Sequence, residues 1–298
     1  MKRDKWELKK NWRGYLLVFP ACVAVILVSI YPMIYGSVIA FKNYVLTKSF
    51  MPDFGQFAGL KNFISVMAKP EFRQACMNTV FWTVTNVVVQ VILATLIALA
   101  LNRNIRCKSF FRTTALIPWA VPSVIAAMTF RFLYDTNVGI VNVILVKLGI
   151  LDQPMSILGN IETARWAVVL ESIWKGTPFV MIFILAALQS VPKDTLESAV
   201  VDGANAFQSF FRIVLPHIKG SVGIATILTT IGTINNFNAV WLMTMGGPSN
   251  STEIMFTYAY RRAFNGNDFG EAAAVSVMMF ILIAVLTSFY VKLMGEEN

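Results

Sequence analysis

The chain has 298 residues, of which 56% are hydrophobic and only 14% are charged. Soluble globular domains carry roughly 25% charged residues, so this composition excludes an ordinary soluble enzyme or binding domain and predicts a bilayer protein. The formal net charge of +9 indicates contact with lipid headgroups through basic loops. Nucleic-acid binding is not expected, because no basic patch with interleaved aromatic residues stands out.

The sequence lacks the residue clusters that metal binding or hydrolysis requires. Cys22, Cys76 and Cys107 are scattered without metal-ligand spacing, and His217 has no second ligand type near it. A zinc site needs three or four clustered ligands, so no metal is expected. The chain also has no G-x-x-x-x-G-K-[ST] segment, the loop that cradles nucleotide phosphates. We therefore expect a chain that is not an enzyme, holds no cofactor, and relies on another polypeptide if ATP drives it.

Six apolar segments are long enough to cross the bilayer, which takes roughly 20 residues as a helix. In chain order, the expected spans are 14–41, 75–102, 111–134, 165–190, 219–243 and 271–294. The first is about twice the length of a signal-peptide core, so we expect it to be retained. The apolar segment 138–151 is shorter and carries Lys147, which favours an interfacial or re-entrant helix. The expected fold is all-α and membrane-integral, with residues 1–298 in a single transmembrane domain.

Basic residues near the N-terminus and after the second span predict the orientation. The first 13 residues contain six Lys or Arg, and the loop at 103–112 contains four and no acid. The positive-inside rule assigns both to the cytoplasm, which is self-consistent because two spans separate them. The segment after the fourth span and the C-terminus are then cytoplasmic as well. The loop at 42–73 is assigned outside although it has five basic residues, since long loops carry weaker topological weight.

The polar segment 191–217, between the fourth and fifth spans, predicts two short amphipathic helices. Asp194 favours the positive end of the first helix dipole. Gly203 turns a helix end at little steric cost, and Asn205 suits the N-cap of the second helix. Pro216 is expected to end that second helix before the fifth span begins.

This segment either lies flat on lipid headgroups or docks a soluble partner. Glu197 and Asp202 would face an anionic inner leaflet, where carboxylates gain nothing. The segment is also compact and has a proline near each end, at Pro192 and Pro216, as a rigid lever would. Both features favour docking.

The same residues resemble a known motif. The segment reads Glu197-Ser198-Ala199, then Asp202-Gly203-Ala204, then Ile213-Val214-Leu215-Pro216. This pattern resembles the EAA loop of binding-protein-dependent ABC importer permeases, with Ser198 where alanine is usual. Further matches resemble the sugar importers of the maltose type, and specifically the first of their two paired permeases. They lie at 31–32, 59–63, 78–79, 111–113, 118–122, 139–142, 185–192 and 244–248.

The resemblance implies a six-helix type I importer domain whose EAA loop is a cytoplasmic coupling helix, seated in a cleft of a separate ATPase subunit. The residues carried over to that contact are Glu197, Ser198, Ala199, Asp202, Gly203 and Ala204. It also implies the partners: a second permease subunit, an ABC ATPase dimer that binds ATP and Mg, an extracytoplasmic solute-binding protein, a carbohydrate and membrane lipid. The location implied is a bacterial cytoplasmic (inner) membrane, with both termini cytoplasmic. The match at 244–248 resembles a family loop that faces the external binding protein.

Polar residues inside the expected spans are candidates for the solute path, because ionisable and amide groups are rare in lipid. They are Glu171, Lys175, Asn235, Asn236, Asn238 and Trp241. Glu171 and Lys175 are four residues apart on a helix, so they either form a structural ion pair or line a polar pathway. The asparagines either touch solute or hydrogen-bond between helices.

Two other functions remain possible from the residues. A self-sufficient secondary transporter would be expected to have inverted repeats and charged relays within its spans; the sequence has no internal repeat and one charge pair. An interfacial sensor or scaffold would use the basic N-terminus as a lipid anchor. Arg261 and Arg262 are expected to contact headgroups.

Overall fold

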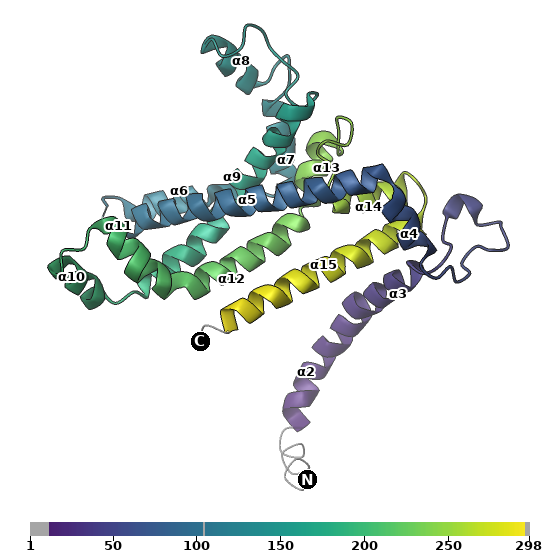
Figure 1. The fold of residues 1–298 in the computed structure, drawn as a ribbon, viewed down its shortest axis with the longest axis horizontal. Coiled ribbons are helices and arrows are strands. Elements are labelled where there is room, and N and C mark those ends of the chain that lie inside the picture. The colour runs from purple at the N-terminus through teal and green to yellow at the C-terminus, as the bar shows by residue number, and fades with distance from the viewer. Residues whose placement is uncertain (1–11, 104, 296–298) are drawn as a thin grey trace. The chain divides into compact units, whose positions relative to one another are not determined.

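The structure is a computed structural model that describes residues 12–103 and 105–295. The described residues are helical apart from connecting loops and isolated bridges (Figure 1), which confirms the predicted all-α class. In chain order the helices are α2 (Trp12–Val25), the π-helix η1 (Ile26–Ile30), α3 (Tyr31–Ile39), the 3₁₀-helix η2 (Leu46–Lys48), α4 (Lys61–Ala68), α5 (Pro70–Asn102), α6 (Lys108–Ala120), α7 (Ser123–Leu133), α8 (Ile140–Lys147), α9 (Ile161–Gln189), α10 (Lys193–Val201), α11 (Ala206–Ser209), the π-helix η3 (Phe210–Val214), α12 (Leu215–Ile234), α13 (Phe237–Thr244), α14 (Met255–Phe264) and α15 (Phe269–Gly295).

Within the described residues, five helices are long and apolar enough to cross a membrane, or six if a bent helix pair counts as one span. The chain divides into two compact units. The first contains the described parts of Met1–Ala68 together with Ala259–Met278, and the second contains Lys69–Tyr258 with the described part of Met279–Asn298.

In the first unit, a buried asparagine ties α4 to the end of α3. The Asn62 amide donates to the carbonyl oxygens of Ala40 and Lys42, both at 2.8 Å. Both acceptors belong to the turn that follows α3, where carbonyl groups have left the helix ladder and need other partners. Asn62 belongs to the segment 59–63 that resembles the sugar importers, and in this structure it stabilises the turn.

Arg262, for which the sequence predicts headgroup contact, forms ion pairs within the first unit. Its guanidinium pairs with Asp268 at 3.6 Å and with Glu271. The Glu271 carboxylate also accepts a hydrogen bond of 2.7 Å from the Ser65 hydroxyl. Asp268 lies in the turn after α14 and Glu271 in the first turn of α15, so Arg262 joins α14 to the start of α15.

In the second unit, α5 packs along α9, and small residues make the close approach possible. Ala94 and Ala98 of α5 are fully buried against Val180 and Ile184 of α9. Small side chains at a helix interface let the two backbones come together and gain dispersion contacts in a setting where lipid gives no hydrophobic driving force. This pair positions the polar residues of both helices relative to each other.

The residues of the expected span 111–134 do not form one straight helix. They form α6 and α7, which meet at a bend of 90°. The sequence at the bend contains Pro122, which cannot donate to the preceding turn of a helix. Val121 before it has φ −68° and ψ 129°, the extended conformation that a following proline favours. We call residues 121–122 the elbow.

The predicted segment 138–151 forms the short helix α8, held to the rest of the second unit by Asn142. This buried side chain donates to the carbonyls of Asp135 and Met155, both at 3.1 Å, and accepts from the Met155 N–H at 3.0 Å. The Asn142 amide therefore uses both of its donor hydrogens and one of its two acceptor lone pairs. These bonds satisfy loop backbone groups that would otherwise need water as a partner.

Candidate functional site

The polar segment 191–217 forms the helix–turn–helix that the sequence predicts up to residue 209. Helix α10 ends at Val201, and Gly203 in the turn after it has a φ of +78°, the left-handed conformation that glycine adopts without strain. Asn205 caps α11: its side chain accepts from the Gln208 N–H at 2.9 Å, and the Gln208 side chain accepts from the Asn205 N–H at 2.9 Å. The predicted N-cap is therefore confirmed, as one half of a capping box.

The outer surface of this segment combines acidic and apolar side chains. Glu197, Asp202 and Gly203 are exposed, whereas Ala199 is buried. Val201 beside them is 86% exposed. The Ser198 hydroxyl donates to the Asp194 carbonyl at 2.8 Å, so it is used within α10 itself. The surface of this segment therefore presents apolar and carboxylate side chains together.

The prediction that Pro216 ends the second helix is wrong. Helix α11 continues through η3 into α12 without a break, and Pro216 lies in the first turn of α12. In a π-turn the bond runs to the fifth preceding residue, as from the Leu215 N–H to the Phe210 carbonyl. We attribute the tolerance of the proline to this wider turn, because a regular α-turn would bring a carbonyl against its ring.

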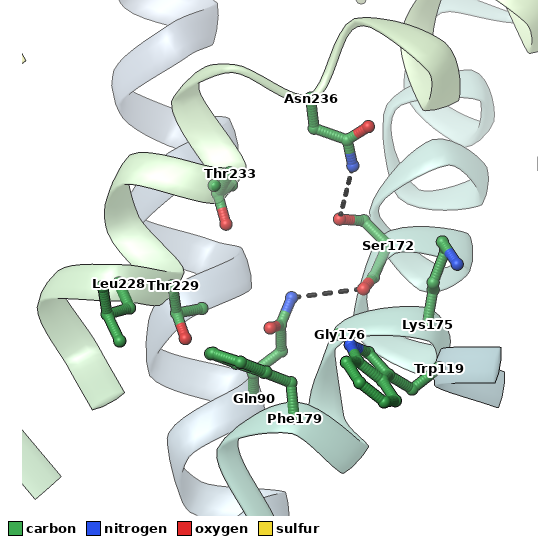
Figure 2. Close-up of a pocket in the computed structure, with 11 residues that line it drawn as sticks. Gln90, Trp119, Ser172, Lys175, Gly176, Phe179, Leu228, Thr229, Thr233 and Asn236 are labelled. Carbon is green, nitrogen blue, oxygen red and sulfur yellow. Dashed lines mark hydrogen bonds between the residues drawn. The ribbon is translucent and has the colours of Figure 1, made fainter. Parts of the chain in front are cut away.

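A cavity of about 290 Å³ opens between α5, α6, α9 and α12 (Figure 2). It is lined by Gln90, Trp119, Ser172, Lys175, Gly176, Phe179, Leu228, Thr229, Gly232, Thr233 and Asn236. The lining alternates hydrogen-bonding groups with aromatic and aliphatic walls. Such a mixture is typical of a site for a polar small molecule.

Two hydrogen bonds organise the polar side of the cavity. The Gln90 amide donates to the Ser172 carbonyl at 3.2 Å, and the Asn236 amide donates to the Ser172 hydroxyl at 3.3 Å (Figure 2). Gly176 leaves room for the first of these bonds, since a Cβ there would lie 2.4 Å from the Gln90 Oε1 atom. The Trp119 and Phe179 rings stack with centroids 6.4 Å apart.

Of the residues predicted for the solute path, Lys175 and Asn236 line this cavity. Asn236 also caps α13 by accepting from the Ala239 N–H at 3.4 Å. The Lys175 amine donates to the Val121 carbonyl.

The other four predicted path residues lie elsewhere. Glu171 is buried next to the cavity rather than in its lining, and Asn235 is exposed, with its amide donating to the Ile231 carbonyl at 3.1 Å. The Asn238 amide donates to the Ser123 hydroxyl of α7 at 2.9 Å, which is the interhelical alternative. Trp241 stacks on Phe237 within α13. The chain turns between α12 and α13, so neighbouring asparagines point to different surroundings.

Residues 90–295 match the family of binding-protein-dependent transport system inner membrane components. The trehalose/maltose transport system permease protein MalF of Thermococcus litoralis is 34% identical over 97% of this chain and 96% of its own length. The chain belongs to this permease family. It is therefore the membrane-embedded permease subunit of an ATP-driven importer, as the EAA resemblance implies.

A further relative is also a sugar permease, and a solved structure has the same fold. The multiple sugar-binding transport system permease protein MsmF of Streptococcus mutans is 29% identical to this permease, over 96% of each chain. The crystal structure of a bacterial ABC transporter involved in import of the acidic polysaccharide alginate has a chain that covers 99% of this permease and 99% of its own length, with a TM-score of 0.81 at 21% identity. None of these relatives favours the self-sufficient secondary transporter.

The sequence interpretation missed most of the polar cavity lining of this permease, although one signal for it exists. In α5 the buried polar residues Thr79, Thr83, Asn86 and Gln90 follow one another at three- or four-residue intervals. That spacing places them on one helix face inside an apolar span, where polar groups are expected to face a cavity or a neighbouring helix. Trp119 and Thr229 carry no comparable signal.

Proposed function

We propose that this permease carries a short saccharide across the cytoplasmic membrane by alternating access, and that the cavity holds the saccharide during passage. The observation that carries this proposal is the lining of the cavity. Two stacked aromatic rings, those of Trp119 and Phe179, form part of the lining. Beside them lie side-chain amides and hydroxyls, which belong to Gln90, Ser172, Thr229, Thr233 and Asn236. Sugar hydroxyls need hydrogen-bond partners, and sugar ring faces pack on aromatic side chains. The volume lies near the lower end of the ~300–1,000 Å³ range of small-molecule sites, which suits a short saccharide rather than a polymer.

The names of the relatives support a carbohydrate as the solute class. They include a trehalose/maltose permease, a multiple sugar permease and a diacetylchitobiose permease. We extend that class to this permease because the relatives match it over nearly its whole length.

Segment 191–217 is the proposed docking element for an ABC ATPase dimer, which binds the ATP and Mg. An exposed carboxylate at Glu197 accepts a charge-assisted hydrogen bond from an arginine of the ATPase in this scheme. Ser198, Ala199, Asp202, Gly203 and Ala204 complete the contact. A second permease subunit completes the translocation path, and an extracytoplasmic solute-binding protein delivers the saccharide.

The function is tested by purifying the permease with its co-expressed partners and reconstituting the complex in vesicles. The probes are maltose, trehalose and N,N′-diacetylchitobiose, with ATP on the cytoplasmic side. We expect the ATPase and a second permease to co-purify, and at least one probe to be imported only with both ATP and binding protein. Import without ATP would support a secondary transporter, and failure of all three probes would reject the saccharide class.

The proposed orientation has both termini and segment 191–217 in the cytoplasm. Cys107 provides a test because it is exposed in the loop between α5 and α6. In a Cys22→Ser, Cys76→Ser background, a membrane-impermeant maleimide should label Cys107 in inside-out vesicles and not in right-side-out cells. Cys107→Ser is the control for background labelling. The reverse pattern would invert the topology and remove segment 191–217 from reach of any cytoplasmic ATPase.

A further inference from the structure

The elbow between α6 and α7 is held by a side chain from another helix. The Lys175 amine of α9 donates to the carbonyl of Val121. This carbonyl lies at the C-terminal end of α6, where the helix dipole and the unpaired carbonyl groups attract a cation. Lys175 therefore contributes a charge-assisted contact at the elbow, where α6 and α7 meet at 90°.

The residues on either side of the elbow pack against different parts of the second unit. On the α6 side, Trp119 stacks on Phe179 and forms part of the cavity wall. On the α7 side, Ser123 accepts from Asn238 of α13. The elbow thus joins a segment that packs on the cavity to a segment that packs on α13, and Lys175 contacts it between the two.

Glu171 offers the same amine a second partner. Glu171 is 1% exposed, and its Oε2 atom has no hydrogen-bond partner in the described part of the chain. A buried carboxylate oxygen without a partner is unfavourable, so a conformation that supplies a donor gains free energy. Glu171 precedes Lys175 by four residues on α9, the spacing and order at which the two side chains can meet.

We propose that Lys175 is a positioning residue whose amine alternates between the Val121 carbonyl and the Glu171 carboxylate during transport. With the amine on Val121, the elbow is held and Trp119 stays in the cavity wall. With the amine on Glu171, the elbow is released and α6 moves relative to α9. The inference deepens the proposed function, because it assigns a conformational control to the cavity proposed for the saccharide.

Distances between spin labels test the conformation of the elbow, and this measurement does not require the solute to be identified. Ile117→Cys on α6 and Leu170→Cys on α9 place labels at exposed positions, with the three native cysteines replaced by serine. Distances between the labels are measured in the assembled complex with its ATPase, without nucleotide and after trapping with ATP and vanadate. We expect a narrow distribution without nucleotide, a broad one in Lys175→Met, and recovery of the narrow one in Lys175→Arg, which keeps a cationic donor.

Glu171→Gln tests the second position. It should keep the narrow distribution without nucleotide. Trapping with ATP and vanadate should shift the distribution of the wild type and leave that of Glu171→Gln unchanged. Lys147→Met on α8, which removes an exposed lysine outside the cavity, is the control and should behave as the wild type.

Transport kinetics separate positioning from direct contact with solute. Lys175→Met should lower the maximal rate of ATP-driven maltose, trehalose or diacetylchitobiose import by about tenfold, the order expected for losing a charge-assisted hydrogen bond, with a nearly unchanged half-saturation concentration. A raised half-saturation concentration with an unchanged maximal rate would overturn the proposal in favour of direct solute contact. A wild-type distance distribution in Lys175→Met would overturn it as well. If the wild-type complex imports none of the three sugars, the proposed function fails, and the distances still decide the role of Lys175.

Discussion

Replacing Gly203 by valine is expected to abolish capture of the ATPase while leaving the permease folded. Gly203 has φ +78°, and apart from its two chain neighbours no described residue has an atom within 4 Å of a Cβ placed on it. A β-branched side chain in this left-handed conformation costs about 1–2 kcal/mol. That is less than the ~5–15 kcal/mol stability of a typical domain. The new methyl groups would project from an exposed turn, so they would obstruct a partner rather than the permease core.

The measurement is co-purification of the ATPase with the variant, together with ATP hydrolysis by the complex. We expect the captured ATPase to fall by more than about tenfold, because residues at the centre of an interface contribute about 2 kcal/mol or more. Gly149→Val is the matched control: Gly149 has φ +69° and the same open surroundings, but it lies in the loop after α8. Equal capture by the Gly203 and Gly149 variants would show that segment 191–217 is not the docking element.

Replacing Gly176 by alanine is expected to lower saccharide import by at least about tenfold. A Cβ at this position would lie 2.4 Å from the Gln90 Oε1 atom and 2.8 Å from its Nε2 atom. The Gln90 amide must therefore leave the Ser172 carbonyl, and loss of a buried hydrogen bond costs about 1–3 kcal/mol. The displaced amide also alters the polar lining of the cavity in which we propose that the saccharide binds.

The matched control for this variant is a glycine outside the cavity. Gly220 of α12 does not belong to the cavity lining, and a Cβ there meets no neighbouring group within 4 Å. Gly220→Ala should keep import within about threefold of the wild type, because substitutions away from packed features stay within roughly 0.5 kcal/mol. Import is measured in reconstituted vesicles, with detergent-solubilised thermal stability as the folding check. Similar import by both variants, with both folded, would mean that the Gln90–Ser172 contact does not matter for transport.

Features that depend on nearby residues could be predicted from the sequence. A run of apolar residues without charges is sufficient to specify a membrane helix, because each backbone group bonds within its own segment. The Asn205 cap and the Gly203 turn were predicted for the same reason: the determining contacts lie within four residues, as in the Asn205–Gln208 pair. Pro216 was misread because a proline ends a regular α-helix but is accommodated where η3 bonds to the fifth preceding residue.

The bend at residues 121–122 shows where local reasoning ends. Pro122 marks a break, yet the angle between α6 and α7 depends on what α7 packs against. The contacts that hold α7 include Asn238 on Ser123 and Arg131 on the Leu242 carbonyl at 3.2 Å. Those partners are more than a hundred residues away along the chain, so no window of sequence around Pro122 contains the information.

The sequence by itself determined that this protein is a helical membrane permease, that its spans are where apolar runs occur, and that a polar segment with the EAA pattern lies between two of them. Composition, hydrophobic run length and short motifs are enough for these conclusions, since each is a property of contiguous residues. Only the tertiary structure decided which polar residues share a cavity. Gln90, Trp119, Ser172 and Thr229 come from four helices far apart in the chain, and they meet because small residues let α5 and α9 pack closely while the elbow turns α6 onto them.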